Sequence, residues 1–286
     1  MTCGAFLGDT ARKQSLVDRL TSHLAAGDLR PESVISWSGE VGSFSGCLSH
    51  AATPAGFEQE TGLPGALSSV LDCLHAIEHT PQMPAGATGL AWIEGIAPGT
   101  DLSGVPARIA AWLFEDPETG LLVCVDDQVV TNAVADLISM HRGSIDGIDP
   151  TVSEWADMRK RLVAMSDGAK DREPPIGVAL SAAEAIAWPM TDGSSSVAEA
   201  LRIHANASVE RVGNRVKAEL GWSVADDAAI QDAFVRRAGG ASTDADTDLL
   251  ARLGELRAAF DARRGEVVAP YFTFLRQLAD EASSRL

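Results

Sequence analysis

The chain has 286 residues, with 23 lysines and arginines against 40 aspartates and glutamates, which gives a formal net charge of −17. Hydrophobic residues make up 45% and charged residues 22% of the composition, so the sequence excludes extensive disorder and predicts a globular protein. Phosphate groups repel an acidic chain, and the basic runs are only two or three residues long. We therefore expect no binding to nucleic acid or to an anionic membrane surface.

The four cysteines stand singly, without a C-x-x-C motif or other tight spacing, which is typical of a reducing compartment. Residues 1–10 lack a basic region followed by an apolar stretch, so no signal peptide is predicted. No run approaches the roughly 18 apolar residues that a membrane helix needs. These features predict a cytoplasmic protein that does not enter a membrane.

Apolar residues recur at helical spacing in four segments of the N-terminal region. The first segment begins with Thr10 as a capping residue and ends at Gly27, and the second begins near Pro64. The third begins at Pro106, because proline favours the first position of a helix, and the fourth ends at Gly143. The apolar residues of these segments are Leu16, Val17, Leu20 and Leu24; Leu67, Val70, Leu71, Leu74 and Ile77; Ile109, Trp112 and Leu113; and Val130, Val134, Leu137 and Ile138.

Glycine, serine and proline are concentrated between these helices. Residues 37–47 could form short strands or an ordered loop, residues 80–101 are expected to be mostly loop, and residues 121–125 could form a short strand. The core of this region is predicted to include Trp112 and the stripe that contains Leu74.

Residues 144–150 form the best candidate for a domain boundary, because alanine becomes dense after them and irregular segments shorten. Helices are predicted over 151–166, 178–188, 194–220, 225–238, 246–264 and 267–284. The sequence therefore predicts a mainly α protein, with a mixed helix and loop domain over 1–145, in which a few short strands could occur. An alanine-rich helical bundle is predicted over 150–286, and the two parts could also pack as one unit.

A cysteine and a histidine three positions apart, Cys47 and His50, lie in a segment rich in glycine and serine. A thiolate activated by an imidazole is a nucleophile, so the pair is a candidate catalytic site. The alternative is structural, because cysteine is often buried as a small hydrophobic residue and three positions are few for a nucleophile and its base. Since Phe44 and Leu48 flank the cysteine, we expect Cys47 to be buried.

The segment from Trp37 to about Leu122 resembles an uncharacterised family of bacterial and phage proteins. Its members have a Gly-Cys-x-x-Gly-Cys-x-x-His-like loop, a Gly-Ile-Pro helix start, a Gly-x-Asp-Leu turn and a tryptophan-bearing helix. The matching segments here are Gly46-Cys47-Leu48-Ser49-His50, Gly62-Leu63-Pro64 with Asp72 following, Gly99-Thr100-Asp101-Leu102 and Ala111-Trp112-Leu113. The family's first loop cysteine falls on Ser43, so chemistry that needs a cysteine pair is not implied. No activity is attached to the family, so the resemblance implies kinship and an alanine-rich helical C-terminal part.

Asp72, His75 and His79 form a second candidate, a metal site, because their spacing places them on one side of a helix and His-x-x-x-His is a helical zinc-ligand spacing. The alternative is a solvated helix face opposite the apolar stripe. Asp244, Asp246, Asp248 and Glu255 match the spacing of a calcium loop, but leucine stands where that loop needs glycine, so a helix start is favoured.

No complete catalytic constellation is visible, and no glycine-rich phosphate loop occurs. The sequence therefore favours a non-enzymatic interaction or accessory protein with no cofactor, whose protein partner and oligomeric state it does not specify. The alternative is a metal- or thiol-dependent hydrolase that uses the Cys47/His50 loop and the Asp72-His75-His79 helix face. A third possibility is an acidic decoy for a nucleic-acid-binding protein, although the acids are dispersed.

Overall fold

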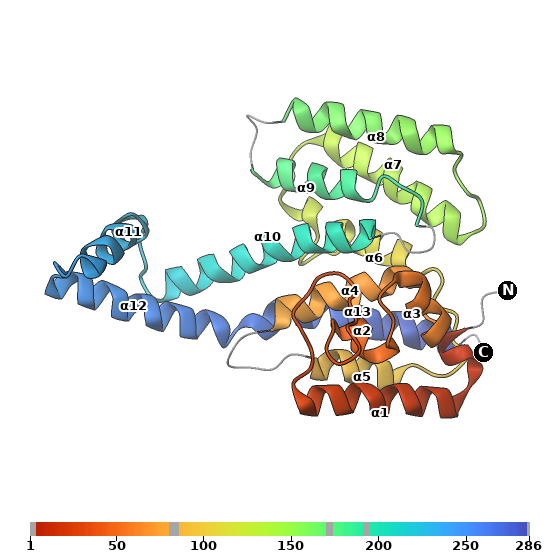
Figure 1. Ribbon diagram of the computed structural model, residues 1–286. Helices are drawn as coiled ribbons and strands as arrows, with labels where there is room; N and C mark the ends of the chain where they lie inside the picture. The colour runs from red at the N-terminus through yellow and green to blue at the C-terminus, as the bar shows by residue number, and fades with distance from the viewer. Residues whose placement is uncertain (1–3, 80–85, 170–173, 191–194, 285–286) are drawn as a thin grey trace. The chain divides into compact units, whose positions relative to one another are not determined.

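The structure, a computed structural model, describes residues 4–79, 86–169, 174–190 and 195–284. These residues form α-helices and two short 3-10 helices, and no β-strand occurs among them, so the mainly α class is confirmed (Figure 1). Residue contacts divide the chain into two compact units, which are Met1–Ala205 with Pro270–Leu286, and Asn206–Ala269. The boundary segment expected at 144–150 lies within the first unit, where it includes the end of helix α7 (Gln128–Ile145) and precedes helix α8 (Val152–Asp167).

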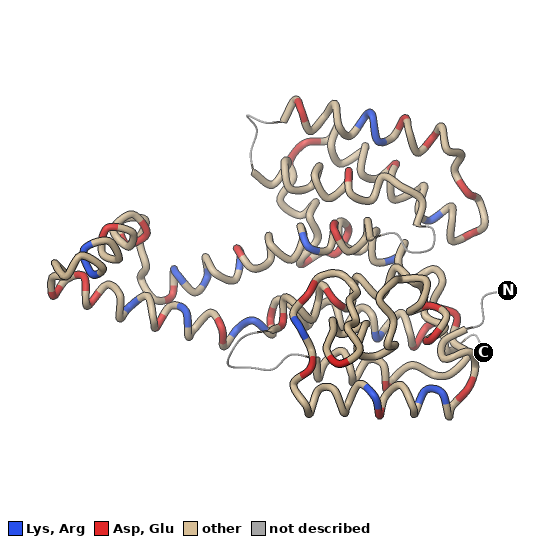
Figure 2. Tube along the Cα trace, viewed as in Figure 1, with Lys and Arg blue, Asp and Glu red and all other residues tan. Residues whose placement is uncertain are grey.

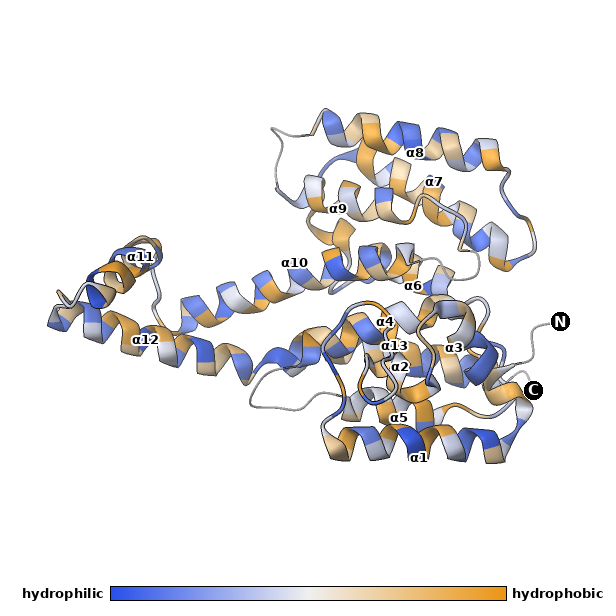
Figure 3. Ribbon diagram, viewed as in Figure 1, coloured by the Kyte–Doolittle hydropathy of each residue, from blue (hydrophilic) through white to orange (hydrophobic). Residues whose placement is uncertain are grey.

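The N-terminal half of the first unit is built around one buried helix. Its elements are η1 (Ala5–Gly8), α1 (Thr10–Ala26), α2 (Phe44–Ser49), α3 (Pro54–Thr61), α4 (Gly65–Glu78) and α5 (Ala87–Gly95). Every residue of α4 from Gly65 to His75 is buried, because α2 and α3 both pack against it. Helix α1 packs in turn against α2 and α5, and Figure 3 shows the hydrophobic residues of α4 and α5. The predicted burial of Leu67, Val70 and Leu74 is confirmed.

The ends of α1 follow from its capping residues. Asp9, rather than the expected Thr10, is the N-cap, and its carboxylate accepts hydrogen bonds from the backbone nitrogens of Ala11 and Arg12. Gly27 ends the helix as expected, in the left-handed conformation with φ of 73°.

Three local expectations are corrected. Of the stretch 80–101, residues 80–85 lie outside the described part of the chain, and within 86–101 helix α5 occupies Ala87–Gly95, where loop was expected. Gly89 lets this helix approach the Phe44 ring, which a β-carbon there would meet at 2.7 Å. Residues 121–125 form no strand, because Leu121–Cys124 is the 3-10 helix η2. Residues 37–47 contain only isolated bridges at Gly42, and helix α2 already begins at Phe44.

The rest of the first unit is also helical. It contains α6 (Val105–Glu115), η2, α7 (Gln128–Ile145), α8 (Val152–Asp167), α9 (Pro174–Ala185), the first part of α10 (Ser196–Glu219) and most of α13 (Arg264–Ser283). Helices α7, α8 and α9 lie side by side (Figure 1). Trp112, expected in the core, is only half-buried, and its ring stacks on Phe274 of α13 with centroids 5.0 Å apart.

The second unit contains α11 (Val224–Ala238) and α12 (Asp244–Asp261), which pack against each other on either side of Gly239 and Gly240. Both helices begin with a capping box, at Ser223 and at Thr243. Asp246 belongs to the second box and also binds Arg236, so the acids that match a calcium-loop spacing form a helix start.

The charged residues are mixed along the chain. Figure 2 shows lysine and arginine interspersed with aspartate and glutamate, without a long run of basic residues. Within the described part of the chain, no helix is both long and apolar enough to cross a bilayer.

Candidate functional site

The segment that contains Cys47 folds as the short helix α2, with His50 as its C-cap, and the loop at Ser36 passes close to this helix. The Ser36 carbonyl lies so close that a β-carbon on Gly46 would be 1.7 Å from its oxygen, and one on Gly42 would be 2.3 Å from it. The backbone nitrogen of Ser43 donates to the same carbonyl at 3.1 Å. The glycines of this segment therefore permit a close backbone approach that no other residue allows.

A carboxylate from α4 holds the N-terminal end of α2. Asp72 accepts from the backbone nitrogen of Ser45 at 2.7 Å and from the Ser43 hydroxyl at 3.0 Å. The Ser43 oxygen in turn accepts from the backbone nitrogen of Gly46 at 3.2 Å, as the N-cap of the helix. Burial raises the pKa of Asp72 to about 7, and the hydrogen bonds from Ser45 and Ser43 oppose that rise.

The expectation of a solvated face for Asp72, His75 and His79 is wrong. Asp72 is fully buried, His75 is 2% exposed and His79 is half-buried, because α4 is covered on several sides by other helices. The His75 ring lies 6.0 Å from the Phe44 ring and 6.0 Å from the His79 ring, measured between centroids. Since the Asp72 oxygens accept hydrogen bonds from the start of α2, this carboxylate has a structural role.

Cys47 lies inside α2 and is fully buried, as expected from its apolar neighbours. Its Sγ lies 3.5 Å from the carbonyl oxygen of Gly42, to which the thiol donates. Burial raises the pKa of Cys47 to about 11, so the thiol stays protonated at neutral pH. A protonated and inaccessible thiol is a poor nucleophile.

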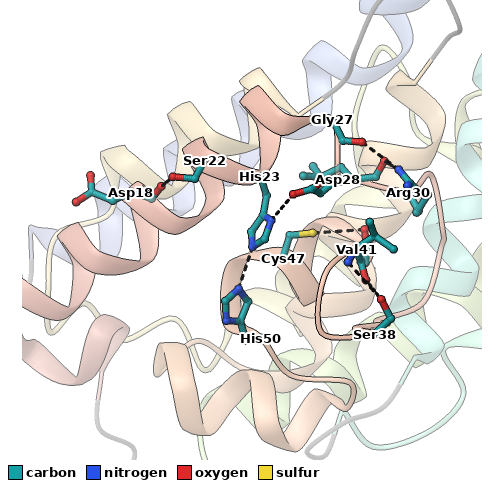
Figure 4. A network of polar contacts seen from close by, with 12 residues as sticks. Asp18, Ser22, His23, Gly27, Asp28, Arg30, Ser38, Val41, Cys47 and His50 are labelled. Carbon is teal, nitrogen blue, oxygen red and sulfur yellow. Dashed lines mark hydrogen bonds and ion pairs between the residues drawn. The ribbon is translucent and has the colours of Figure 1, made fainter.

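His50 caps the C-terminal end of α2 in a left-handed conformation, with φ of 56°. Its Nε2 lies 2.9 Å from Nε2 of His23, which stands in the last turn of α1. Nδ1 of His23 lies 2.8 Å from the Asp28 carboxylate, so a carboxylate and two imidazoles form a row (Figure 4). The Trp37 ring stacks on His50 with centroids 4.2 Å apart and an interplanar angle of 10°.

The protonation of this row follows from its contacts. When His23 is neutral, its hydrogen bond to Asp28 places the ring proton on Nδ1 and leaves the lone pair of Nε2 facing His50. Partial burial lowers the pKa of His50, and the nearby positive charge of Arg19 lowers it further, as protonation of His23 does. The lowered pKa favours neutral His50, which donates from Nε2 when it faces the lone pair of His23.

The structure does not bring the five candidate residues together at one site; these are Cys47, His50, Asp72, His75 and His79. His50 and Asp72 lie at opposite ends of α2, which is about 9 Å long for its six residues. His50 instead contacts His23 and Trp37, and His23 links it to Asp28; none of these three was a candidate site residue from the sequence. No local spacing marks them, because His23 and His50 are 27 positions apart and meet only through packing of α1 on α2.

A second feature of the first unit is a groove of about 940 Å³ between α6, α7 and α13. Its lining includes two guanidinium groups, each paired with a carboxylate: Arg108 with Glu281 at 2.9 Å, and Arg142 with Glu115. The stacked rings of Trp112 and Phe274 also line it. The remaining charged residues of the lining are Asp101, Asp116, Asp146 and Asp149.

The described residues hold no group of three or more side chains placed to bind a metal ion. Comparison with family models, with curated proteins and with solved structures finds no match to this chain. The resemblance of residues 37–122 to a bacterial and phage family stays a prediction, and a functional assignment depends on the geometry of the groove and of the histidine row.

Proposed function

We propose that this protein is a non-enzymatic, cytoplasmic interaction protein that binds a positively charged segment of a protein partner in the groove between α6, α7 and α13. The observation that carries the proposal is the charge of that groove. Six carboxylates and two guanidinium groups line it, which leaves a net charge of −4. Such a surface attracts a cationic segment and repels nucleic acid.

Three helix ends at the groove also favour a positively charged ligand. Helix α6 ends at Glu115 with Asp116 as its C-cap, and α7 ends with Asp146 as its C-cap. Glu281 lies in the last turn of α13. The C-terminal end of a helix carries a partial negative charge, so carboxylates there are unfavourable for stability. Three such ends at one groove create a negative potential that a bound cation relieves.

The aromatic floor gives the groove an apolar contact surface. Trp112 and Phe274 are half-buried and stacked with an interplanar angle of 14°. A guanidinium or ammonium group lies favourably over the face of a tryptophan, and more so where water is displaced. We therefore expect arginine-rich segments to bind more tightly than lysine-rich ones.

The test is a titration of the protein with a short fluorescent peptide rich in arginine, followed by anisotropy at low and at physiological salt. We expect binding that weakens with salt, no binding of a glutamate-rich peptide of equal length, and no binding of duplex DNA. The double variant Asp146→Lys/Asp149→Lys, which changes two exposed groove residues, should weaken peptide binding about tenfold or more.

The matched control reverses two exposed carboxylates outside the groove, in Asp18→Lys/Asp157→Lys. It changes the net charge equally, so retained binding in this control assigns the effect to the groove. Equal losses in both double variants, or binding of the glutamate-rich peptide, would contradict the proposal.

The alternative of a thiol- or metal-dependent hydrolase has little support in this geometry. Its thiol, Cys47, is buried with a raised pKa. Its carboxylate, Asp72, is bound to Ser43 and Ser45 at the other end of α2 from His50.

A further inference from the structure

The two imidazoles of the histidine row face each other through the same ring atom. Nε2 of His23 and Nε2 of His50 lie 2.9 Å apart, although the two residues come from different elements. The rings are nearly perpendicular, at 67°, with centroids 5.2 Å apart. Both nitrogens therefore point at one position between the rings.

At 2.9 Å the two nitrogens cannot both direct lone pairs at each other, so a proton or a metal ion lies between them. In neutral His23, the hydrogen bond to Asp28 leaves a lone pair on Nε2 that is directed at His50. If Nε2 of His50 also carried a lone pair, the two would repel each other. In the neutral pair a proton on His50 fills the place, and a metal ion can replace this proton when His50 shifts its hydrogen to Nδ1 by exchange with water.

The surroundings resemble those of a metal-binding histidine. A carboxylate on the outer nitrogen of a ligating imidazole fixes its tautomer and raises its basicity, and Asp28 binds His23 in this way at 2.8 Å. Stacking on Trp37 fixes the plane of the His50 ring. His50 is exposed, so an ion can reach the site from solvent.

The geometry points to a transition-metal site formed by Nε2 of His23 and Nε2 of His50, with Asp28 as the positioning carboxylate and water completing the coordination. Two nitrogens at about 2.0 Å from one tetrahedral zinc ion lie about 3.3 Å apart, so the rings need to separate by roughly 0.4 Å. Imidazole ligands favour zinc, nickel and copper over magnesium and calcium. With two protein ligands the site is open, and its ion remains exchangeable.

The experiment uses tag-free full-length protein in a Cys3→Ser/Cys124→Ser background, so that these two thiols do not bind or reduce the probe. Zinc(II) affinity is measured by competition with a chromogenic chelator, and copper(II) by electron paramagnetic resonance. We expect one ion per chain, with coupling of copper to two imidazole nitrogens. Magnesium should not compete.

Three variants locate the site. His23→Gln and His50→Asn should each weaken zinc binding at least about tenfold, and asparagine tolerates the left-handed backbone at position 50. Asp28→Asn should weaken binding about tenfold without removing a ligand. Thermal unfolding of each metal-free variant verifies that it is folded.

His79→Ala is the matched control, because it removes a half-buried imidazole at the C-cap of α4 and leaves the proposed ligands in place. Unchanged zinc binding in this control supports the proposal. Loss of binding in His79→Ala but not in His23→Gln and His50→Asn would overturn it. So would a copper spectrum with a single coupled nitrogen, or equal zinc affinity in the unaltered chain and the His23→Gln/His50→Asn double variant.

Discussion

Asp72 accepts a hydrogen bond of 2.7 Å from the backbone nitrogen of Ser45, so a carboxylate of α4 stabilises the first turn of α2. The contact is fully buried, and it joins two helices that both belong to the core of the first unit. A negative charge at the N-terminal end of a helix is favourable, whereas its burial is unfavourable. The balance between these two effects makes Asp72 sensitive to pH.

The first prediction is that Asp72 makes the free energy of unfolding fall as pH rises from about 4 to about 7. Its folded-state pKa of about 7 is above the unfolded value of 3.8, so the folded chain holds a proton that the unfolded chain has lost. The stabilisation is complete below about pH 4 and declines by at most about 1.4 kcal/mol per pH unit. Urea unfolding at several pH values, compared between the protein and Asp72→Asn, measures it.

The control for this prediction is Asp157→Asn, which changes an exposed carboxylate and should preserve the pH dependence. The same decline with pH in Asp72→Asn as in the unaltered protein would assign the effect to other groups.

The second prediction concerns the close approach over α2. Gly46→Ala should destabilise the protein by about 3 kcal/mol or more, because the added carbon would lie 1.7 Å from the Ser36 carbonyl oxygen. Gly95→Ala, in α5, should change stability by less than about 1 kcal/mol, since nothing lies within 4 Å of the added carbon. Chemical denaturation of both variants compares them, and equal stability would contradict the described path of residues 36–46.

The third prediction tests the central position of α4. Leu74→Ala should reduce the free energy of unfolding by about 2–5 kcal/mol, the usual range for a buried leucine, because Leu74 is fully buried. Val163→Ala, whose side chain is 41% exposed, should cost much less. A change below about 0.5 kcal/mol for Leu74→Ala would place this helix face at the surface.

The fourth prediction is an order of thiol reactivity. In a Cys3→Ser background, Cys124 should react with a thiol reagent in the native protein, because it is exposed. Cys47 and Cys73 should react only on unfolding, since burial raises their pKa values to about 11 and about 12. Labelling followed by peptide mass spectrometry distinguishes the three thiols, and fast native labelling of Cys47 would return it to consideration as a nucleophile.

The sequence predicts the helices well where the apolar pattern is long and regular. The helix expected over 225–238 occupies Val224–Ala238, and that expected over 194–220 occupies Ser196–Glu219. Helix α5 was missed because prolines and glycines are dense around it, although few lie within it. The buried side of α4 was misjudged because a one-sided stripe suggests one packing partner, whereas α2 and α3 both cover this helix.

The candidate site is less predictable, because its contacts come from tertiary packing. His50 stands out by its nearness to Cys47, yet its contacts are with His23 and Trp37. Neither residue is separated from His50 by a spacing that would place the two on one face of a helix or strand. The groove is unpredictable for the same reason, since Trp112 and Phe274 belong to helices far apart in the chain.

The stacking of Phe274 on Trp112 has a consequence for synthesis on the ribosome. The first unit consists of two stretches of chain, Met1–Ala205 and Pro270–Leu286, and the whole second unit is translated between them. Until residues 270–283 leave the ribosome, Trp112 of α6 lacks its contacts with Tyr271 and Phe274, so this apolar surface stays exposed. A ribosome that stalls within α11 or α12 therefore carries an unfinished first unit, which is a natural substrate for chaperones.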